Sequence, residues 1–125
     1  MTGVQTCALP ISQGFLAGRY LDTPPRFDDT DHRSTFSDQE IGWLWESARR
    51  LRFLDELPGG MAASALRFCL THPAVTTVIP GMRSCNQVAA NSMAGELGPL
   101  DEMTLERITQ AVPNVYEGWR RKVPA

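Results

Sequence analysis

The chain has few of the features that mark specialised partners. Its 125 residues carry 12 basic and 14 acidic side chains, a net charge of −2, so it lacks the basic field that attracts nucleic acid. No apolar run approaches the roughly 20 residues that cross a bilayer. The start, Met1 to Thr6, has no positive charge before its short apolar stretch, unlike a secretory signal. We therefore expect neither nucleic acid nor a membrane as partner.

Cysteine and histidine are also scarce. Cys7, Cys69 and Cys85 show no CxxC spacing, and His32 and His72 lie near no cysteine cluster. An odd set of dispersed thiols is typical of reduced cytosolic proteins rather than of disulfide frameworks or zinc sites. We expect a cytoplasmic location and no metal site. The hydrophobic content of 42% and charged content of 21% are those of an ordinary globular domain.

Hydrophobic periodicity and turn residues predict short strands followed by helices. In chain order we expect a strand at 4–11, a long polar connection at 12–36, a helix from Ser37 broken at 55–60, a helix at 61–71, a strand at 75–79, a helix from 85 to about 94, and one more from Asp101. Ser37 and Glu40 have the spacing of a capping box. Strands alternating with helices indicate parallel β/α units.

The run from Val75 to Asn91 is the most informative. A β-branched stretch stops at Pro80-Gly81 and leads into a helix, for which Ser84 and Gln87 have capping-box spacing. A helix N-terminus presents free N–H groups and the positive end of the helix dipole, which together suit an anion.

Four residues in this run could complete a nucleotide-binding site. Gly81 lets the backbone approach a ligand closely, and Arg83 adds a fork suited to a phosphate. Gln87 and Asn91, one turn apart on one helix face, could bond the polar edge of a base. Each residue alone is more often an ordinary turn or surface residue, but their joint spacing predicts a phosphate site with adenine beside it.

Three strings in this chain resemble the aldo-keto reductases. The pattern I-P-G-x-R-x-x-x-Q-x-x-x-N at 79–91 is similar to the C-terminal signature of that family. Pro10 to Tyr20 resembles its segment P-L-x-x-G-x-L-x-G-K/R-Y after the seventh barrel strand, and Ala65 to Pro73 resembles the helix before the eighth strand. The three strings keep the family's order and span roughly residues 10 to 108.

The resemblance implies an α/β fold: a helix-rich, incomplete C-terminal part of a (β/α)8 TIM barrel. Only two strands are expected here, whereas a closed barrel has eight in about 250 residues. Residues 10–108 would be the reductase portion and 109–125 a C-terminal tail. Residues 1–9 fit the family's apolar strand poorly, which suggests a truncated or foreign start.

The function implied is that of an NADP-dependent carbonyl or alcohol oxidoreductase, with NADPH and a small carbonyl compound as partners. The family's catalytic Asp, Tyr, Lys and His lie in the first half of the barrel; Tyr20, Tyr116 and Lys122 do not match them, so no residue here is assigned to catalysis. Two alternatives stay open. One is a non-catalytic nucleotide-sensing subunit resembling the potassium-channel β subunits. The other is a small helical interaction module anchored by Trp43, Trp45, Tyr116 and Trp119.

The resemblance also implies a set of cofactor contacts. Backbone groups of five residues between 11 and 16 would contact the pyrophosphate and ribose. Two loop arginines, at 19 and 33, would supply positive charge, and five residues between 81 and 91 would hold the 2′-phosphate and the adenine. An arginine at position 83 favours NADP over NAD, because a 2′-phosphate rewards a cationic fork. The implied residues are Ile11, Ser12, Gln13, Gly14, Leu16, Arg19, Arg33, Gly81, Met82, Arg83, Gln87 and Asn91.

Overall fold

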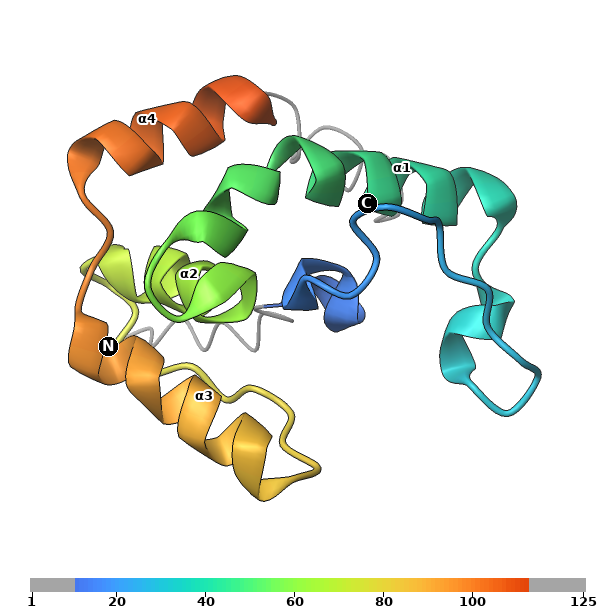
Figure 1. The fold of residues 1–125 in the computed structure, drawn as a ribbon, viewed down its shortest axis with the longest axis horizontal. Coiled ribbons are helices and arrows are strands. Elements are labelled where there is room, and N and C mark those ends of the chain that lie inside the picture. Colours follow the sequence, from blue (N-terminus) through green and yellow to red (C-terminus); the bar gives the residue numbers. More distant parts are fainter. Residues whose placement is uncertain (1–10, 113–125) are drawn as a thin grey trace.

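The computed structural model describes residues 11–112, and all regular elements in that range are helical (Figure 1). Four α-helices are joined by loops and by three short 3₁₀ helices. The α-helices are α1 (Asp38–Arg50), α2 (Gly60–Thr71), α3 (Cys85–Leu97) and α4 (Glu102–Ala111). The 3₁₀ helices are η1 (Ser12–Ala17), η2 (His32–Thr35) and η3 (Arg52–Glu56).

Helix α1 begins at the predicted capping box. The Glu40 N–H donates to Ser37 Oγ at 3.3 Å, and the Ser37 N–H donates to the Glu40 carboxylate at 2.9 Å. Two N-terminal donors that the helix itself leaves unpaired are thereby satisfied. The helix ends at Arg50, earlier than the break expected at 55–60, because the chain tightens into η3 first.

Helix α2 lies at the centre of the described residues and contacts η1, η3 and α3 (Figure 1). Its buried positions are Met61, Ala63, Ser64, Ala65 and Leu66, whereas Ala62 and Cys69 are half-buried. The main apolar cluster consists of Phe15, Leu21, Ala48, Leu51, Phe53, Leu54, Met61, Leu100 and Ile108.

The last two helices also start where their caps predict. Ser84 Oγ accepts the Gln87 N–H at 3.3 Å, but the predicted capping box is only half formed, because the Gln87 side-chain oxygen accepts the Arg83 N–H and not that of Ser84. Helix α3 then runs three residues beyond the expected end. Asp101 caps α4 by accepting the Thr104 N–H at 2.8 Å. Helix α4 continues past 108, where we placed the start of a tail; positions 113–125, with Tyr116 and Trp119, lie outside the described residues.

The strand predicted at 75–79 is the main error within the described residues. Residues 75–79 form an irregular connection whose one backbone hydrogen bond to other described residues is from the Val75 N–H to the His72 carbonyl at 2.9 Å. A β-branched run becomes a strand only when a neighbouring strand completes its ladder, and residues 11–112 contain no such neighbour. Of the first predicted strand, only Ile11 is described, and it lies in a turn. The helix-rich character is confirmed, but the α/β alternation is absent from this part of the chain.

The described residues form neither a membrane-spanning helix nor a cluster of metal ligands. None of the described helices combines the length and apolarity needed to span a bilayer. Within 11–112 no three His, Cys, Asp or Glu side chains are grouped so that they could hold a metal ion.

Candidate functional site

The first predicted segment forms a strained turn at the start of η1. Ser12, Gln13 and Gly14 have φ angles of 48°, 54° and 93°. Such angles suit glycine but are uncommon for serine and glutamine. The turn is closed by the N–H groups of Gly14 and Leu16, which donate to the Ile11 carbonyl at 2.9 and 3.2 Å. Two adjacent non-glycine residues in this region need support from outside the turn.

That support comes from the segment leading into η2. Arg33 Nη1 donates to the backbone carbonyl of Gln13 at 2.9 Å. The Gln13 side-chain oxygen lies 2.6 Å from His32 Nε2, within hydrogen-bonding distance. Gln13 is thus held through both its main chain and its side chain by two consecutive residues.

The guanidinium of Arg33 is itself held in place. Its Nε and Nη2 donate to the two carboxylate oxygens of Asp31 at 2.9 and 2.6 Å, a bidentate pair. The group lies 4.1 Å from the centre of the Phe27 ring. The hydrogen bonds from Arg33 hold the pKa of Asp31 well below its usual range, and the same bonds raise the pKa of Arg33. The pair therefore stays ionised at any ordinary pH.

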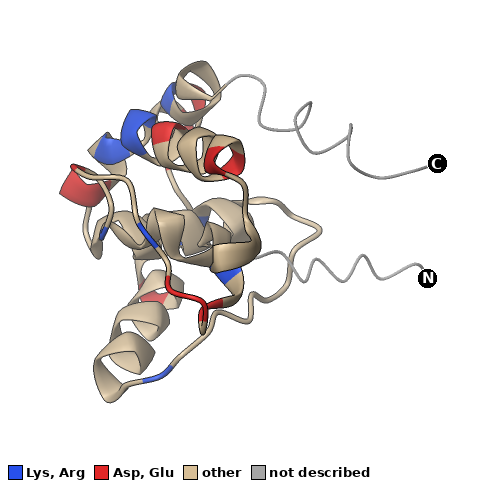
Figure 2. Ribbon diagram, turned by 90° about the vertical axis from the view of Figure 1, so that its right-hand side faces the viewer, with Lys and Arg blue, Asp and Glu red and all other residues tan. Residues whose placement is uncertain are grey.

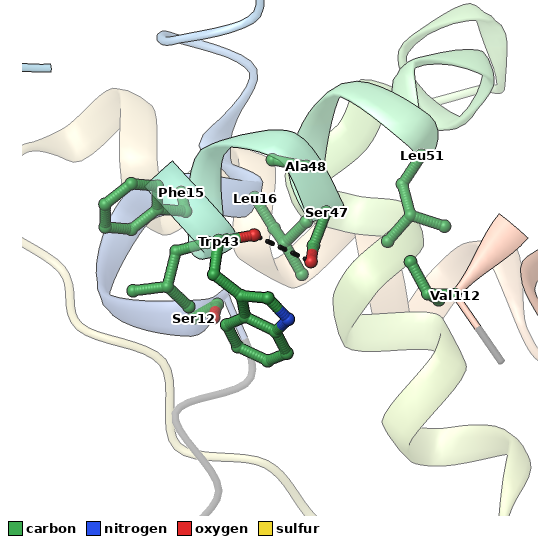
Figure 3. A pocket seen from close by; sticks show the side chains of 9 residues that line it. Ser12, Phe15, Leu16, Trp43, Ser47, Ala48, Leu51 and Val112 are labelled. Carbon is green, nitrogen blue, oxygen red and sulfur yellow. Dashed lines mark hydrogen bonds between the residues drawn. The ribbon is translucent and has the colours of Figure 1, made fainter. Parts of the chain in front are cut away.

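A small cavity lies between η1 and α1 (Figure 3). Its volume is about 90 Å³, and its walls are mostly apolar. Among its lining residues are Ser12 and Leu16 from η1, and Trp43 and Ser47 from α1. Small-molecule sites usually occupy about 300–1,000 Å³, so this cavity is too small to enclose a dinucleotide. Arg19, beyond η1, is exposed and makes no ion pair with other residues in 11–112.

The second predicted segment is an exposed loop fastened to α3. The Arg83 N–H donates to the Gln87 side-chain oxygen at 2.6 Å, and Asn91 Nδ2 lies 3.5 Å from the Gly81 carbonyl. The two amides that we expected to face a base therefore also hold the loop. Their other polar groups, Gln87 Nε2 and Asn91 Oδ1, have no partner among the described residues.

The end of this loop has the features of an anion site. Arg83 is exposed, and its guanidinium makes no ion pair within the described range. Basic and acidic residues are spread over several helices and loops of the described chain (Figure 2). The N–H groups of Cys85 and Asn86, in the first turn of α3, likewise have no partner there. A β-carbon added to Gly81 would meet nothing within 4 Å, so packing does not require glycine at that position. Met82 beside it is 50% exposed.

The two segments meet on one buried cluster. Ile11 and Val78 both pack against the cluster of Ala63, Leu66 and Ala94, which joins α2 to α3. No hydrogen bond or ion pair between described residues links 12–33 directly to 79–91. The structure therefore places the predicted residues in two separate groups that are joined through this apolar cluster.

Sequence reasoning missed the partners of Gln13. Asp31 and His32 were not singled out, although Asp31 stands two residues before Arg33 and can cap the turn that follows it. The Arg33 N–H does donate to Asp31 Oδ1 at 2.9 Å. The acidic-x-basic spacing was the available signal.

An open helix N-terminus such as that of α3 is suited to bind an anion, and backbone strain such as that at Ser12–Gly14 tends to occur at functional sites. The sequence profile of the Aldo/keto reductase family matches residues 3–113, and the chain belongs to this family of oxidoreductases. The resemblance carried by the three strings is thus confirmed for the family, which implies part of a TIM barrel, a nicotinamide cofactor and a carbonyl substrate. No curated protein and no solved structure is detectably similar to the chain.

Proposed function

We propose that this chain supplies the phosphate- and adenine-binding end of an NADP-dependent aldo-keto reductase. The observation that carries the proposal is the exposed guanidinium of Arg83 beside two open N–H groups of α3, those of Cys85 and Asn86. An exposed cationic fork close in sequence to a helix N-terminus is suited to a doubly charged phosphate. A ribose hydroxyl, as in NAD, would gain little from it.

Each part of the loop then has its own task. Backbone groups of Gly81 and Met82, with the Arg83 side chain, hold the 2′-phosphate of the cofactor. Gln87 and Asn91 keep the loop in shape with one polar group each, and their remaining polar groups face the adenine. The remaining groups are an amide N–H donor of Gln87 and a carbonyl acceptor of Asn91, which suit the edge of a planar base that offers both acceptors and donors.

The strained turn would take the middle of the cofactor. Backbone groups of Ile11, Ser12, Gln13, Gly14 and Leu16 would lie against the pyrophosphate and ribose. Backbone N–H groups of a tight turn can form a concave anion site, and those of Ser12 and Gln13 have no partner among the described residues. The exposed Arg19 would add positive charge near the pyrophosphate.

The chain contributes binding and not the proton transfer. Bound NADPH supplies the hydride, but reduction also needs a general acid at the carbonyl. Tyr20 packs its ring against Phe15 and Phe27, at centroid distances of 5.9 and 6.2 Å. The single lysine, Lys122, lies outside the described residues. We expect no reduction of an aldehyde panel above the rate without protein when this chain is assayed alone.

Comparative cofactor binding tests the proposal. Titration of the complete protein with NADPH and with NADH, followed by cofactor fluorescence, should show tighter binding of NADPH. The preference should decrease as salt rises, because an exposed ion pair is screened. Equal affinity for the two cofactors at low salt would contradict the proposal.

One observation favours a second candidate, a small helical interaction module. The described residues bury an apolar cluster of their own, and Trp43 is still 39% exposed. A soluble monomer of this chain that melts in one sharp calorimetric transition would support the module. Broad melting or aggregation would favour the reductase assignment, in which other barrel strands complete the fold.

A further inference from the structure

We infer that Asp31, His32 and Arg33 are positioning residues, which together form a clasp on the turn Ser12–Gly14. The clasp holds this turn in the conformation in which it meets the cofactor pyrophosphate. The inference rests on the proposed function and refines it, because Arg33 then acts through Gln13 and makes no contact with a phosphate itself.

Gln13 is held by two hydrogen-bonding contacts, one to its backbone and one to its side chain. Arg33 binds its backbone carbonyl at 2.9 Å, and His32 binds its side-chain oxygen at 2.6 Å. These partners are 20 and 19 residues away in sequence, so a tertiary contact and not the local turn sets the position of Gln13. Gln13 is also a non-glycine residue at positive φ, where the backbone would otherwise relax.

The bonds of Arg33 suit a residue that holds the turn in place and does not bind a ligand itself. Its side chain is 18% exposed, and three of its nitrogens are already bonded to Asp31 and Gln13. Turning toward a ligand would break the bidentate pair and the contact with the Phe27 ring. By contrast, Arg19 and Arg83 are exposed and have no such commitments among the described residues.

Gly14 shows how closely the clasp lies against the turn. A β-carbon at position 14 would come within 3.2 Å of Arg33 Nη1. The absence of a side chain there lets the guanidinium reach the Gln13 carbonyl. The positive φ of 93° favours glycine, and a side chain at position 14 would also push the Arg33 guanidinium back by a few tenths of an ångström.

The Asp31→Asn variant separates support from direct contact. Asparagine has nearly the same size, but it cannot offer two charged acceptors to the guanidinium, so the clasp should loosen. Binding of NADPH and of NADH should both weaken, by about 10-fold, which corresponds to the loss of one charge-assisted pair. If Arg33 instead touched the phosphate, releasing it from Asp31 would leave binding unchanged or make it tighter.

A fragment of the cofactor gives the selective readout. The probe 2′,5′-ADP carries the adenine and the 2′-phosphate but has no pyrophosphate. Its affinity for Asp31→Asn should equal that for the wild-type protein, because the 81–91 loop is intact. Equal weakening of 2′,5′-ADP and NADPH would mean that the substitution disturbs the whole fold, and would overturn the inference.

Two further variants complete the experiment in the full protein. His32→Ala removes the side-chain contact with Gln13, together with the exposed contacts of the ring to Asp31 and Phe36, and should weaken both dinucleotides by about two- to tenfold. Asp22→Asn breaks the exposed pair with Arg52, 3.0 Å apart, and is the matched control with no expected effect. Failure of the wild-type protein to bind either NADPH or 2′,5′-ADP would refute the proposed function. Wild-type binding of both, with unchanged NADPH affinity in Asp31→Asn and His32→Ala, would refute the clasp alone.

Discussion

The backbone N–H of Arg83 donates to the side-chain oxygen of Gln87 at 2.6 Å, so the loop ahead of α3 is tied to the first turn of that helix. This bond fixes the direction in which the chain leaves residue 83. The backbone of Arg83 is held by this bond, whereas its side chain is exposed just ahead of the helix N-terminus. An arginine that is anchored at its main chain and open at its side chain is well arranged to bind an anion.

We predict that Arg83→Ala weakens NADPH binding by about 10–100-fold, because a charge-assisted pair contributes about 1.5–3 kcal/mol. NADH has no 2′-phosphate and should bind almost as before. Fluorescence titration of both cofactors measures this difference. Arg50→Ala, which removes another exposed arginine, is the matched control. Equal weakening of NADPH and NADH would show that Arg83 shapes the loop and does not read the phosphate.

Gly59 should tolerate no side chain. Its φ is +85°, and an added β-carbon would lie 2.6 Å from the β-carbon of Ala63 and 3.2 Å from Leu97 Cδ1. We expect Gly59→Ala to reduce the free energy of unfolding by more than about 1 kcal/mol. Gly95→Ala is the control, since Gly95 lies inside α3 with open space around it, and should stabilise by up to about 1 kcal/mol. Urea unfolding compares them, and similar stability of the two variants would contradict the expectation.

Loss of the α1 capping box should be measurable. Ser37→Ala removes the acceptor for the Glu40 N–H and should cost about 0.5–2 kcal/mol of unfolding free energy. Ser37→Asp keeps an acceptor and should restore most of it. Thermal melts followed by circular dichroism give the comparison, and an unchanged melting temperature in Ser37→Ala would count against the cap.

Acid should lower the free energy of unfolding, because the carboxylates of Asp31 and Asp101 stabilise turns only while they are ionised. The pKa of Asp101 is lowered by hydrogen bonds from the Thr104 backbone and side chain, and that of Asp31 by Arg33. A lowered folded-state pKa gives stability that is present above the unfolded value, near 3.9, and is lost as pH falls through the folded value. Unfolding free energy should thus be steady from about pH 5 to 8 and fall below about pH 4.

Asp101→Asn tests that assignment by chemical denaturation over a pH series. It should be less stable than wild type at neutral pH, and the gap should close in acid. Asp29→Asn is the control, because Asp29 is exposed and has no polar partner in the described residues. A gap for Asp101→Asn that does not change with pH would refute the role of its charge.

What the sequence predicted well was local. The caps at Ser37, Ser84 and Asp101 were visible because donor and acceptor lie three residues apart, within one turn. The strand at 75–79 was wrong because β-branched residues show only a preference, and pairing depends on a distant neighbour. The hydrogen bond from Arg33 to Gln13 joins residues that are 20 apart, and no local spacing pattern predicts such a contact.

The connection between α2 and α3 has one more consequence, for cleavage. Residues 76–80 make no backbone hydrogen bonds within the described structure, and Ile79 is 79% exposed. Proteases bind chains whose backbone groups are open in this way, so brief digestion should cut here first. Arg67 of α2 donates to the Gly98 carbonyl at 2.8 Å, beyond the cut, and Ala63 and Ala94 share one buried cluster. Mass spectrometry should therefore find two peptides that still travel together on a sizing column until denaturant separates them.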